Sequence, residues 1–300
     1  MPSQFSSCLL PYKVVSITGP DSEKFLQGQM SCDISKLEDQ QATFGTLNTP
    51  KGRIYLIFLI VRIEDHFLLR AHEATIDAAL AVLSKYKVFF KCEITATNLT
   101  VSSAQTKPPN FDHAPAGYEN IVACKPNSDQ ANTDYLWRCP GELERYEHWS
   151  TNATSEKNEA AAEAWHAEDC KAGIAEIYPE TSEKFVLQQL NLQKLGAVSF
   201  QKGCYTGQEI IARMKFLGKL KKQSYLIEAE CLEALPCNAA IITADGKKCG
   251  ELVRMHAVTT RAMSVGLGIV DIAKAESQEA MFIQGDVLVP CKISTINYPE

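Results

Sequence analysis

The sequence lacks the paired cysteines and the long apolar runs that define several protein classes. Its 11 cysteines are spread over 300 residues, with no Cys-x-x-Cys pair and no zinc-like spacing. This pattern indicates a reducing compartment, and we expect a cytoplasmic protein. The longest apolar run, Ile54 to Val61, is far too short to span a membrane and predicts a buried strand.

Basic residues are scarce near the amino end. Only Lys13 precedes residue 20 and the first arginine is Arg53, so we expect neither a secretory signal nor a mitochondrial transit peptide. The net charge of −6 argues against a surface built to bind nucleic acid. There is no phosphate-binding loop, and Gly266-Leu267-Gly268 lacks the third glycine of a dinucleotide site. We expect no direct nucleic-acid partner and no membrane partner.

The hydrophobic content of 45% can supply a sizeable core in a chain of this length. Up to about residue 220, strand patterns alternate with single helices, including a helix over 74–86 and strands over 12–18, 42–47, 54–61, 66–70 and 88–96. Beyond that, short strands with turn signals follow at regular spacing. The sequence therefore predicts an α+β body of antiparallel sheets with helices over 1–220 and a small C-terminal β-barrel over 221–300.

Glycines, a thiol, an aromatic ring and a helix start converge between Lys202 and Leu217. Thr206 and Glu209 have the spacing of a capping box, which predicts a helix from about Gly207. Cys204 would then lie close to the amino end of that helix, where unpaired N–H groups favour a thiolate. The local pattern alone supports a reactive Cys204 and a structural, buried Cys204 about equally.

The octapeptide Lys-Gly-Cys-Tyr-Thr-Gly-Gln-Glu at 202–209 resembles the signature of the YgfZ family, folate-binding proteins related to the T-protein, or aminomethyltransferase, of the glycine cleavage system. Further segments extend this resemblance over most of the chain: 17–29, 49–53, 185–192 and 195–200. The resemblance implies a T-protein-like folate-binding body. It also implies a role in making or repairing iron–sulfur proteins, with an indirect effect on the enzymes that modify tRNA.

The resemblance also implies a set of site residues. Cys204 would be the reactive thiol, acting by sulfur chemistry or by transient contact with an iron–sulfur cluster. Tetrahydrofolate or a one-carbon derivative would contact residues at matching positions: Tyr12, Trp165, Lys202, Gly203, Tyr205, Gln208 and Glu209. Tyr12 replaces a tryptophan of the family, and Lys171 stands where relatives often carry glutamate. No metal site is predicted, because His166 and Cys170 are only two ligands without a third.

Three hypotheses on function stay open. The first is an accessory factor that binds folate and serves iron–sulfur client or assembly proteins. The second is an aminomethyltransferase-like transfer of one carbon to tetrahydrofolate. T-proteins carry paired aspartates where this chain has Leu56 and Ile57, so a transferase would lack its carboxylate. The third is a scaffold protein whose Cys204 is structural. The sequence favours a factor over a transferase.

Between positions 202 and 222 the chain has six basic residues and one acid, Glu209. Such a cluster beside Cys204 could attract the glutamate tail of a folate or an acidic partner. It could equally be a solvated helix end, since lysine near the carboxyl terminus of a helix is favourable in any case. A site for an RNA backbone is a third, weaker interpretation.

Overall fold

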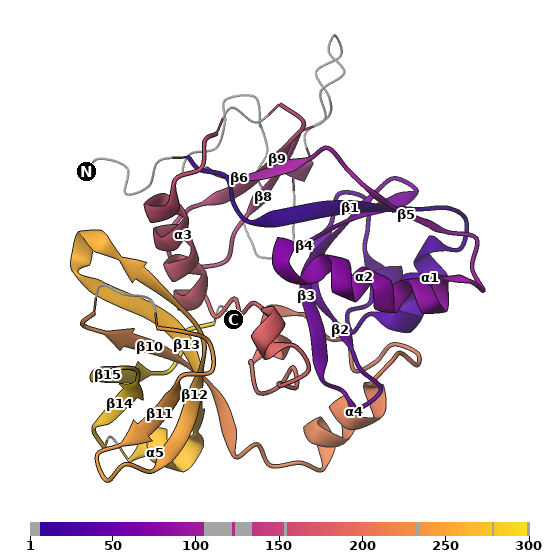
Figure 1. The fold of residues 1–300 in the computed structure, drawn as a ribbon. Coiled ribbons are helices and arrows are strands. Elements are labelled where there is room, and N and C mark those ends of the chain that lie inside the picture. The colour runs from indigo at the N-terminus through magenta and orange to yellow at the C-terminus, as the bar shows by residue number, and fades with distance from the viewer. Residues whose placement is uncertain are drawn as a thin grey trace.

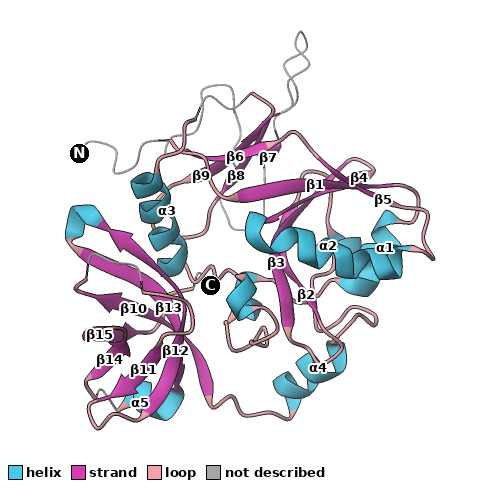
Figure 2. Cartoon of the chain, in the orientation of Figure 1, coloured by secondary structure: helices cyan, strands magenta, loops and turns pink. Residues whose placement is uncertain are grey.

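The computed structural model describes residues 7–104, 122–123, 134–152, 155–231, 235–277 and 279–298. These residues form three antiparallel sheets, the last of which closes into a barrel, with helices packed around them (Figures 1 and 2). The α+β class and the C-terminal barrel are therefore confirmed. None of the helices in the described ranges is long and apolar enough to cross a membrane.

The first sheet has the strand order β2-β3-β4-β1-β5. Its strands are β1 (Tyr12–Thr18), β2 (Ala42–Asn48), β3 (Ile54–Ile63), β4 (His66–His72) and β5 (Glu93–Ala96), and its helices are α1 (Ser22–Gln29) and α2 (Glu73–Lys87). β3 explains the long apolar run. Leu56, Phe58 and Ile60 join the core beneath α1 and α2. The alternate residues Ile57, Leu59 and Val61 join the core on the other face.

The second sheet has the order β6-β9-β8-β7 and packs into that other core. Its strands are β6 (Thr100–Ala104), β7 (Val122–Ala123), β8 (Asp134–Arg138) and β9 (Tyr146–Ser150). Helix α3 (Glu159–Lys171) follows, and the Asn158 side chain accepts a hydrogen bond from the Ala161 N–H at its start. The tryptophans Trp149 and Trp165 are both fully buried here, so α3 is fixed against the sheet.

The barrel has the closed order β10-β13-β12-β11-β14-β15. Its elements are β10 (Lys222–Ala229), β11 (Ala240–Thr243), β12 (Lys248–Val258), β13 (Met263–Asp271), α5 (Ile272–Glu276), β14 (Met281–Gln284) and β15 (Leu288–Ser294). α3 packs on β12 and β13, so the barrel lies against the body (Figure 1). The predicted boundary at 220/221 falls just before β10, and the division into two domains stays a prediction.

The capping-box prediction is wrong, because Thr206 is not the N-cap of α4. The N-cap residue of helix α4 (Gln208–Phe216) is Gly207, which has a φ of 87° and makes no side-chain cap. The hydroxyl of Thr206 instead donates to Gln29 Oε1 at 3.1 Å. The Thr206 hydroxyl therefore forms a long-range hydrogen bond and does not cap the helix.

Four further strand assignments differ from the expectation. The strand predicted over 88–96 begins only at Glu93, and strands β6, β9 and β14 carry too few alternating apolar residues to be recognised. β6, for example, buries Ser102 and Ser103 and only one apolar side chain, Val101. The prolines and glycine within 108–117 also predict a loop over 103–119. Apart from the last residues of β6, this range lies outside the described residues.

Candidate functional site

An open cleft of about 1080 Å³ lies between α2 and α3, with β1 and β5 on its floor. Tyr12 of β1 and His166 of α3 line its inner end, and Glu163 of α3 lines its side. Glu73, Asp77 and Glu159 add acidic groups, while Lys13 and Lys157 supply the cations. Its size is that of a small-molecule site.

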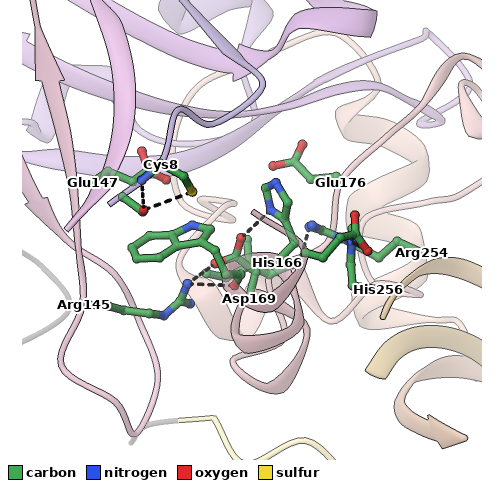
Figure 3. A network of polar contacts seen from close by, with 12 residues as sticks. Cys8, Arg145, Glu147, His166, Asp169, Glu176, Arg254 and His256 are labelled. Atoms are coloured by element: carbon green, nitrogen blue, oxygen red, sulfur yellow. Dashed lines mark hydrogen bonds and ion pairs between the residues drawn. The ribbon is translucent and has the colours of Figure 1, made fainter. Parts of the chain in front are cut away.

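Behind this inner end, charged side chains form a buried network, which we call the charged junction (Figure 3). It consists of Arg70, Arg145, Glu147, Glu163, His166, Asp169, Glu176, Arg254 and His256. These residues come from the first sheet, the second sheet, α3, the loop after α3 and the barrel. The junction is therefore the place where the first two sheets, α3 and the barrel meet.

Arg70 holds two carboxylates on the body side of the junction. Its Nε donates to Glu147 Oε2 at 3.0 Å, and a second nitrogen pairs with the other oxygen of Glu147. Nη1 lies 3.6 Å from Glu176 Oε1. The guanidinium carbon also lies 4.0 Å from the centre of the Tyr12 ring, so a cation–π contact joins Tyr12 to the junction.

Glu176 is the junction residue whose protonation is poised near neutrality. Burial raises the pKa of Glu176 to about 7, and the nearby charges of Arg70 and Arg254 only partly oppose this rise. A carboxyl group with such a pKa can exchange a proton at physiological pH.

The pKa of Asp169 is shifted in the opposite direction, downward. Burial disfavours its charge, but Arg145 and His166 outweigh burial and hold the pKa of Asp169 below its ordinary value. Arg145 Nη1 lies 2.6 Å from Asp169 Oδ1, and His166 Nδ1 lies 3.2 Å from Oδ2. The Arg145 guanidinium also stacks 4.7 Å from the Trp165 ring centre. The carboxylate thus stays charged and fixes both its neighbours.

The barrel contributes Arg254 and His256 from β12. Arg254 Nε donates to His256 Nε2 at 2.9 Å, and His256 Nδ1 lies 3.2 Å from both carboxylate oxygens of Glu163. Burial, reinforced by Arg254, lowers the pKa of His256 to about 4, so the ring is neutral and its Nδ1–H donates to Glu163. Gly266 allows this approach of strands, because a Cβ there would lie 2.3 Å from the Arg254 carbonyl.

Tyr12 and Trp165, two of the predicted folate contacts, both touch the charged junction. Tyr12 lies edge-on to His166 with ring centres 5.9 Å apart and also lines the cleft. Trp165 is completely buried and does not line it. Its indole nitrogen has no hydrogen-bond partner among the described atoms, and neither has Arg254 Nη2. A ligand in the cleft would therefore meet Tyr12 directly, and Trp165 only after side-chain movement.

The remaining predicted site residues lie elsewhere, on the loop that leads into α4 and in the first turn of α4. Figure 1 shows α4 below β2 and β3, on the flank away from α3. The structure therefore does not place these six residues, Lys202, Gly203, Cys204, Tyr205, Gln208 and Glu209, around the cleft. The reactive thiol of Cys204 and the folate contacts of the other five stay predictions.

Lys202 is turned into the protein on this loop. Its ammonium donates to the carbonyls of Met30 at 2.9 Å and Cys32 at 2.7 Å. Burial lowers the pKa of Lys202 to about 8. The Tyr205 ring is buried, with the Lys202 ammonium 5.1 Å from its centre. These contacts tie the loop to the body on either side of Gly203 and Cys204.

Cys204 itself is exposed, whereas the other cysteines within the described ranges are buried or half-buried. Gln208 is half-buried and Glu209 is exposed. The structure thus separates the thiol, which is open to large partners, from the cleft between α2 and α3. The described residues also contain no cluster of three or more His, Cys, Asp or Glu arranged to hold a metal ion.

Sequence reasoning missed most of the charged junction. One usable signal was present: Arg70 and Arg254 each stand alone inside an apolar strand, in Phe67-Leu68-Leu69-Arg70-Ala71 and Leu252-Val253-Arg254-Met255. A single charge in such a run must be paired inside the fold. The partners could not be read from the sequence, because they lie 77 residues away in the case of Arg70 and Glu147.

No family model matches the chain. Among solved structures, the chain is similar to the glycine cleavage system aminomethyltransferase T from Bartonella henselae, with a TM-score of 0.70 and 12% identity. The match covers 98% of this chain and 86% of the other. At this identity the similarity shows that the chain has the T-protein-like fold.

Proposed function

We propose that the protein is a folate-binding factor that supports the assembly or repair of iron–sulfur proteins, and through them tRNA modification. The observation that carries this proposal is the exposed Cys204 of the Lys-Gly-Cys-Tyr-Thr-Gly-Gln-Glu segment on a T-protein-like fold. In this proposal the cleft takes tetrahydrofolate or a one-carbon derivative, and Cys204 serves the client protein. The two sites have separate tasks.

The cleft residues fit a reduced folate. A pterin ring presents N–H donors, for which the acids Glu73, Glu159 and Glu163 are acceptors, and Tyr12 offers an aromatic surface. Lys13 and Lys157 can meet the carboxylates of the glutamate tail. Bound folate would supply a one-carbon carrier.

Aminomethyltransferase-like one-carbon transfer is the second candidate, and Glu176 is the observation that favours it. A buried carboxyl group with a pKa of about 7, next to Tyr12 at the inner end of the cleft, is suited to proton transfer. Against it, the positions that match the T-protein aspartates hold Leu56 and Ile57, which are buried in the two cores. We therefore place this activity second.

The folate site is tested by calorimetric titration of tetrahydrofolate into the wild type and two matched variants of α3. Ala162 lines the cleft and is half-buried, whereas Ala160 is exposed and lies outside it. We expect Ala162→Trp to abolish binding by filling the cleft and Ala160→Trp to leave it unchanged. Unchanged binding by Ala162→Trp would show that the cleft assignment is wrong, and no binding by the wild type would refute the folate proposal.

The thiol is tested by restoring iron–sulfur enzyme activity in cells that lack the protein. We expect Cys204→Ala to bind tetrahydrofolate normally and to fail in this assay. The half-buried Cys237 provides the control, and Cys237→Ala should restore activity. Full rescue by Cys204→Ala would instead support a scaffold protein with a structural thiol. Transfer of a one-carbon unit by purified protein, lost in Glu176→Gln, would favour the transferase.

A further inference from the structure

The helix that follows the Cys204 loop ends in exposed apolar side chains. Phe216 at the end of α4 is 67% exposed and Leu217 is 83% exposed. Phe216 packs edge-on against the half-buried Phe200, with ring centres 6.4 Å apart. Phe200 precedes Cys204 by only four residues. The exposed thiol lies on the loop that leads into α4, and Phe200 joins this loop to the far end of the helix. We call the exposed side of this loop and helix the α4 face.

Cations surround these apolar side chains. The Lys215 ammonium lies 3.7 Å from the centre of the Phe200 ring and 5.3 Å from that of Phe216. Arg213, Lys219 and Lys221 are exposed nearby in the chain. Glu209 is the one acid between positions 202 and 222. The α4 face is thus positive, although the whole chain has a net charge of −6.

The arrangement has the properties of a protein-docking surface. Aromatic and arginine side chains are enriched at the centres of protein interfaces, where an exposed ring enters an apolar pocket of the partner. Phe216 is held in position by Phe200 and Lys215, so little side-chain freedom is lost when a partner binds it. The positive charge selects an acidic surface and raises the rate of encounter.

We propose that the α4 face, consisting of Phe200, Cys204, Arg213, Lys215, Phe216 and Leu217, docks an acidic segment of a client protein that carries apolar side chains. Docking presents the client to Cys204. This inference rests on the proposed function in one respect, which is that the docked protein is the iron–sulfur client.

The test measures how fast Cys204 of the full chain reacts with defined peptides. Each peptide carries one cysteine activated as a 2-pyridyl disulfide. The Cys204 sulfur bonds to the peptide sulfur, and pyridine-2-thione leaves and is followed by its absorbance. The first peptide has glutamates and leucines around the cysteine. The second replaces each glutamate by lysine, and the third replaces each leucine by serine. The rate of Cys204→Ser is subtracted for the other thiols.

We expect the acidic, apolar peptide to react about tenfold faster than the lysine peptide at low ionic strength, and the difference to shrink with added salt. Arg213→Glu with Lys215→Glu should remove or reverse the difference. Phe216→Ser with Leu217→Ser should remove the advantage over the serine peptide. Rates with neutral 2,2′-dithiodipyridine correct for changes in the thiol itself.

The chain offers a matched control at the end of α2. Val88 and Phe89 are 78% and 86% exposed there, beside the exposed Lys85 and Lys91. Lys85→Glu with Lys91→Glu changes the net charge of the protein as much as the α4 double variant does. It should leave all three peptide rates unchanged. If this control lost the preference for the acidic peptide to the same extent, the net charge of the protein and not the α4 face would set the rates. That result would overturn the inference.

Two other outcomes would also overturn it. Equal rates for the acidic and lysine peptides would show that the α4 face does not select acids. Sedimentation with phosphatidylserine vesicles that is lost in Phe216→Ser with Leu217→Ser would identify a membrane contact instead. The proposed function fails separately, when Cys204→Ala restores iron–sulfur enzyme activity in cells, so the two failures are distinguishable.

Discussion

The charged junction and the α4 face depart from the usual distribution of residues in opposite directions. Arg70 and Arg254 are 2% and 1% exposed, although arginine is almost never fully buried without a partner. Phe216 and Leu217 are largely exposed, although such side chains usually lie in a core. In the junction every guanidinium meets a carboxylate, an aromatic ring or a carbonyl inside the protein. At the α4 face the matching groups would, in our proposal, come from a partner protein.

This contrast separates two kinds of chemistry. Buried charges that are already paired hold parts of a fold together and set the protonation of groups such as Glu176. Exposed apolar and cationic groups with a thiol do little for the fold and are available to partners. Mutations in the junction should therefore change the stability of the fold, and mutations in the α4 face should change binding.

The largest effect is expected for Arg70→Ala. It leaves the carboxylates of Glu147 and Glu176 buried without their shared cation, and should lower the free energy of unfolding by about 3–5 kcal/mol. Urea titration followed by circular dichroism measures the change. Arg62 is the control, since its ion pair with Glu23 is partly exposed and Arg62→Ala should cost less than about 1 kcal/mol.

Volume and charge can be separated at the same site. Arg70→Met keeps most of the side-chain volume but still strands the carboxylates. Adding Glu147→Gln should recover part of the lost stability, because an uncharged amide is easier to bury. If Arg70→Ala and Arg62→Ala prove equally mild, the junction does not hold the parts of the fold together.

The next effect concerns Gly207, which joins the Cys204 loop to α4. Gly207 has a φ of 87°, and a Cβ there would lie 2.7 Å from the Thr49 carbonyl. Gly207→Ala should therefore lower the free energy of unfolding by about 1–3 kcal/mol and slow the reaction of Cys204 with the acidic peptide. Gly203 is the control on the same loop, since a Cβ there meets nothing within 4 Å. Equal costs for the two substitutions would refute this account.

A smaller, pH-dependent effect is expected for Glu176→Gln. Burial raises the pKa of Glu176 to about 7 from an ordinary 4.5, so the folded state holds a proton that the unfolded state releases between these values. Glu176 therefore removes stability as pH rises from about 4.5 to 7. Measured against the wild type, Glu176→Gln should gain at least about 1 kcal/mol between pH 5 and pH 8.

The control for this prediction is the exposed Glu180. Glu180→Gln should follow the wild-type pH profile, including the loss of stability at acid pH. That acid loss is expected because burial lowers the pKa values of His72, to about 3, and His256, to about 4, so these rings must be charged on unfolding. A Glu176→Gln profile parallel to that of wild type would show that Glu176 titrates normally.

The sequence predicted the parts of the fold that local patterns determine. The apolar run at β3 and the spaced strands of the barrel follow from side-chain periodicity, and both are confirmed. The prediction of a Thr206 cap was wrong, because the Thr206 hydroxyl donates a hydrogen bond to Gln29, 177 residues away. The charged junction was missed for the same reason. Its ion pairs join residues from distant elements, and no local sequence pattern shows which buried charges pair with each other.

The smallest effect on stability is expected for Phe216→Ser. Its ring packs against Phe200 and Lys215 but is 67% exposed, so the free energy of unfolding should change by no more than about 0.5 kcal/mol. Phe25→Ala, at a fully buried phenylalanine, should cost about 3–5 kcal/mol in the same urea titration. A cost above about 1 kcal/mol for Phe216→Ser would mean that the ring serves the fold. An unchanged fold with a lost peptide preference leaves binding as the reason for an exposed phenylalanine on the α4 face.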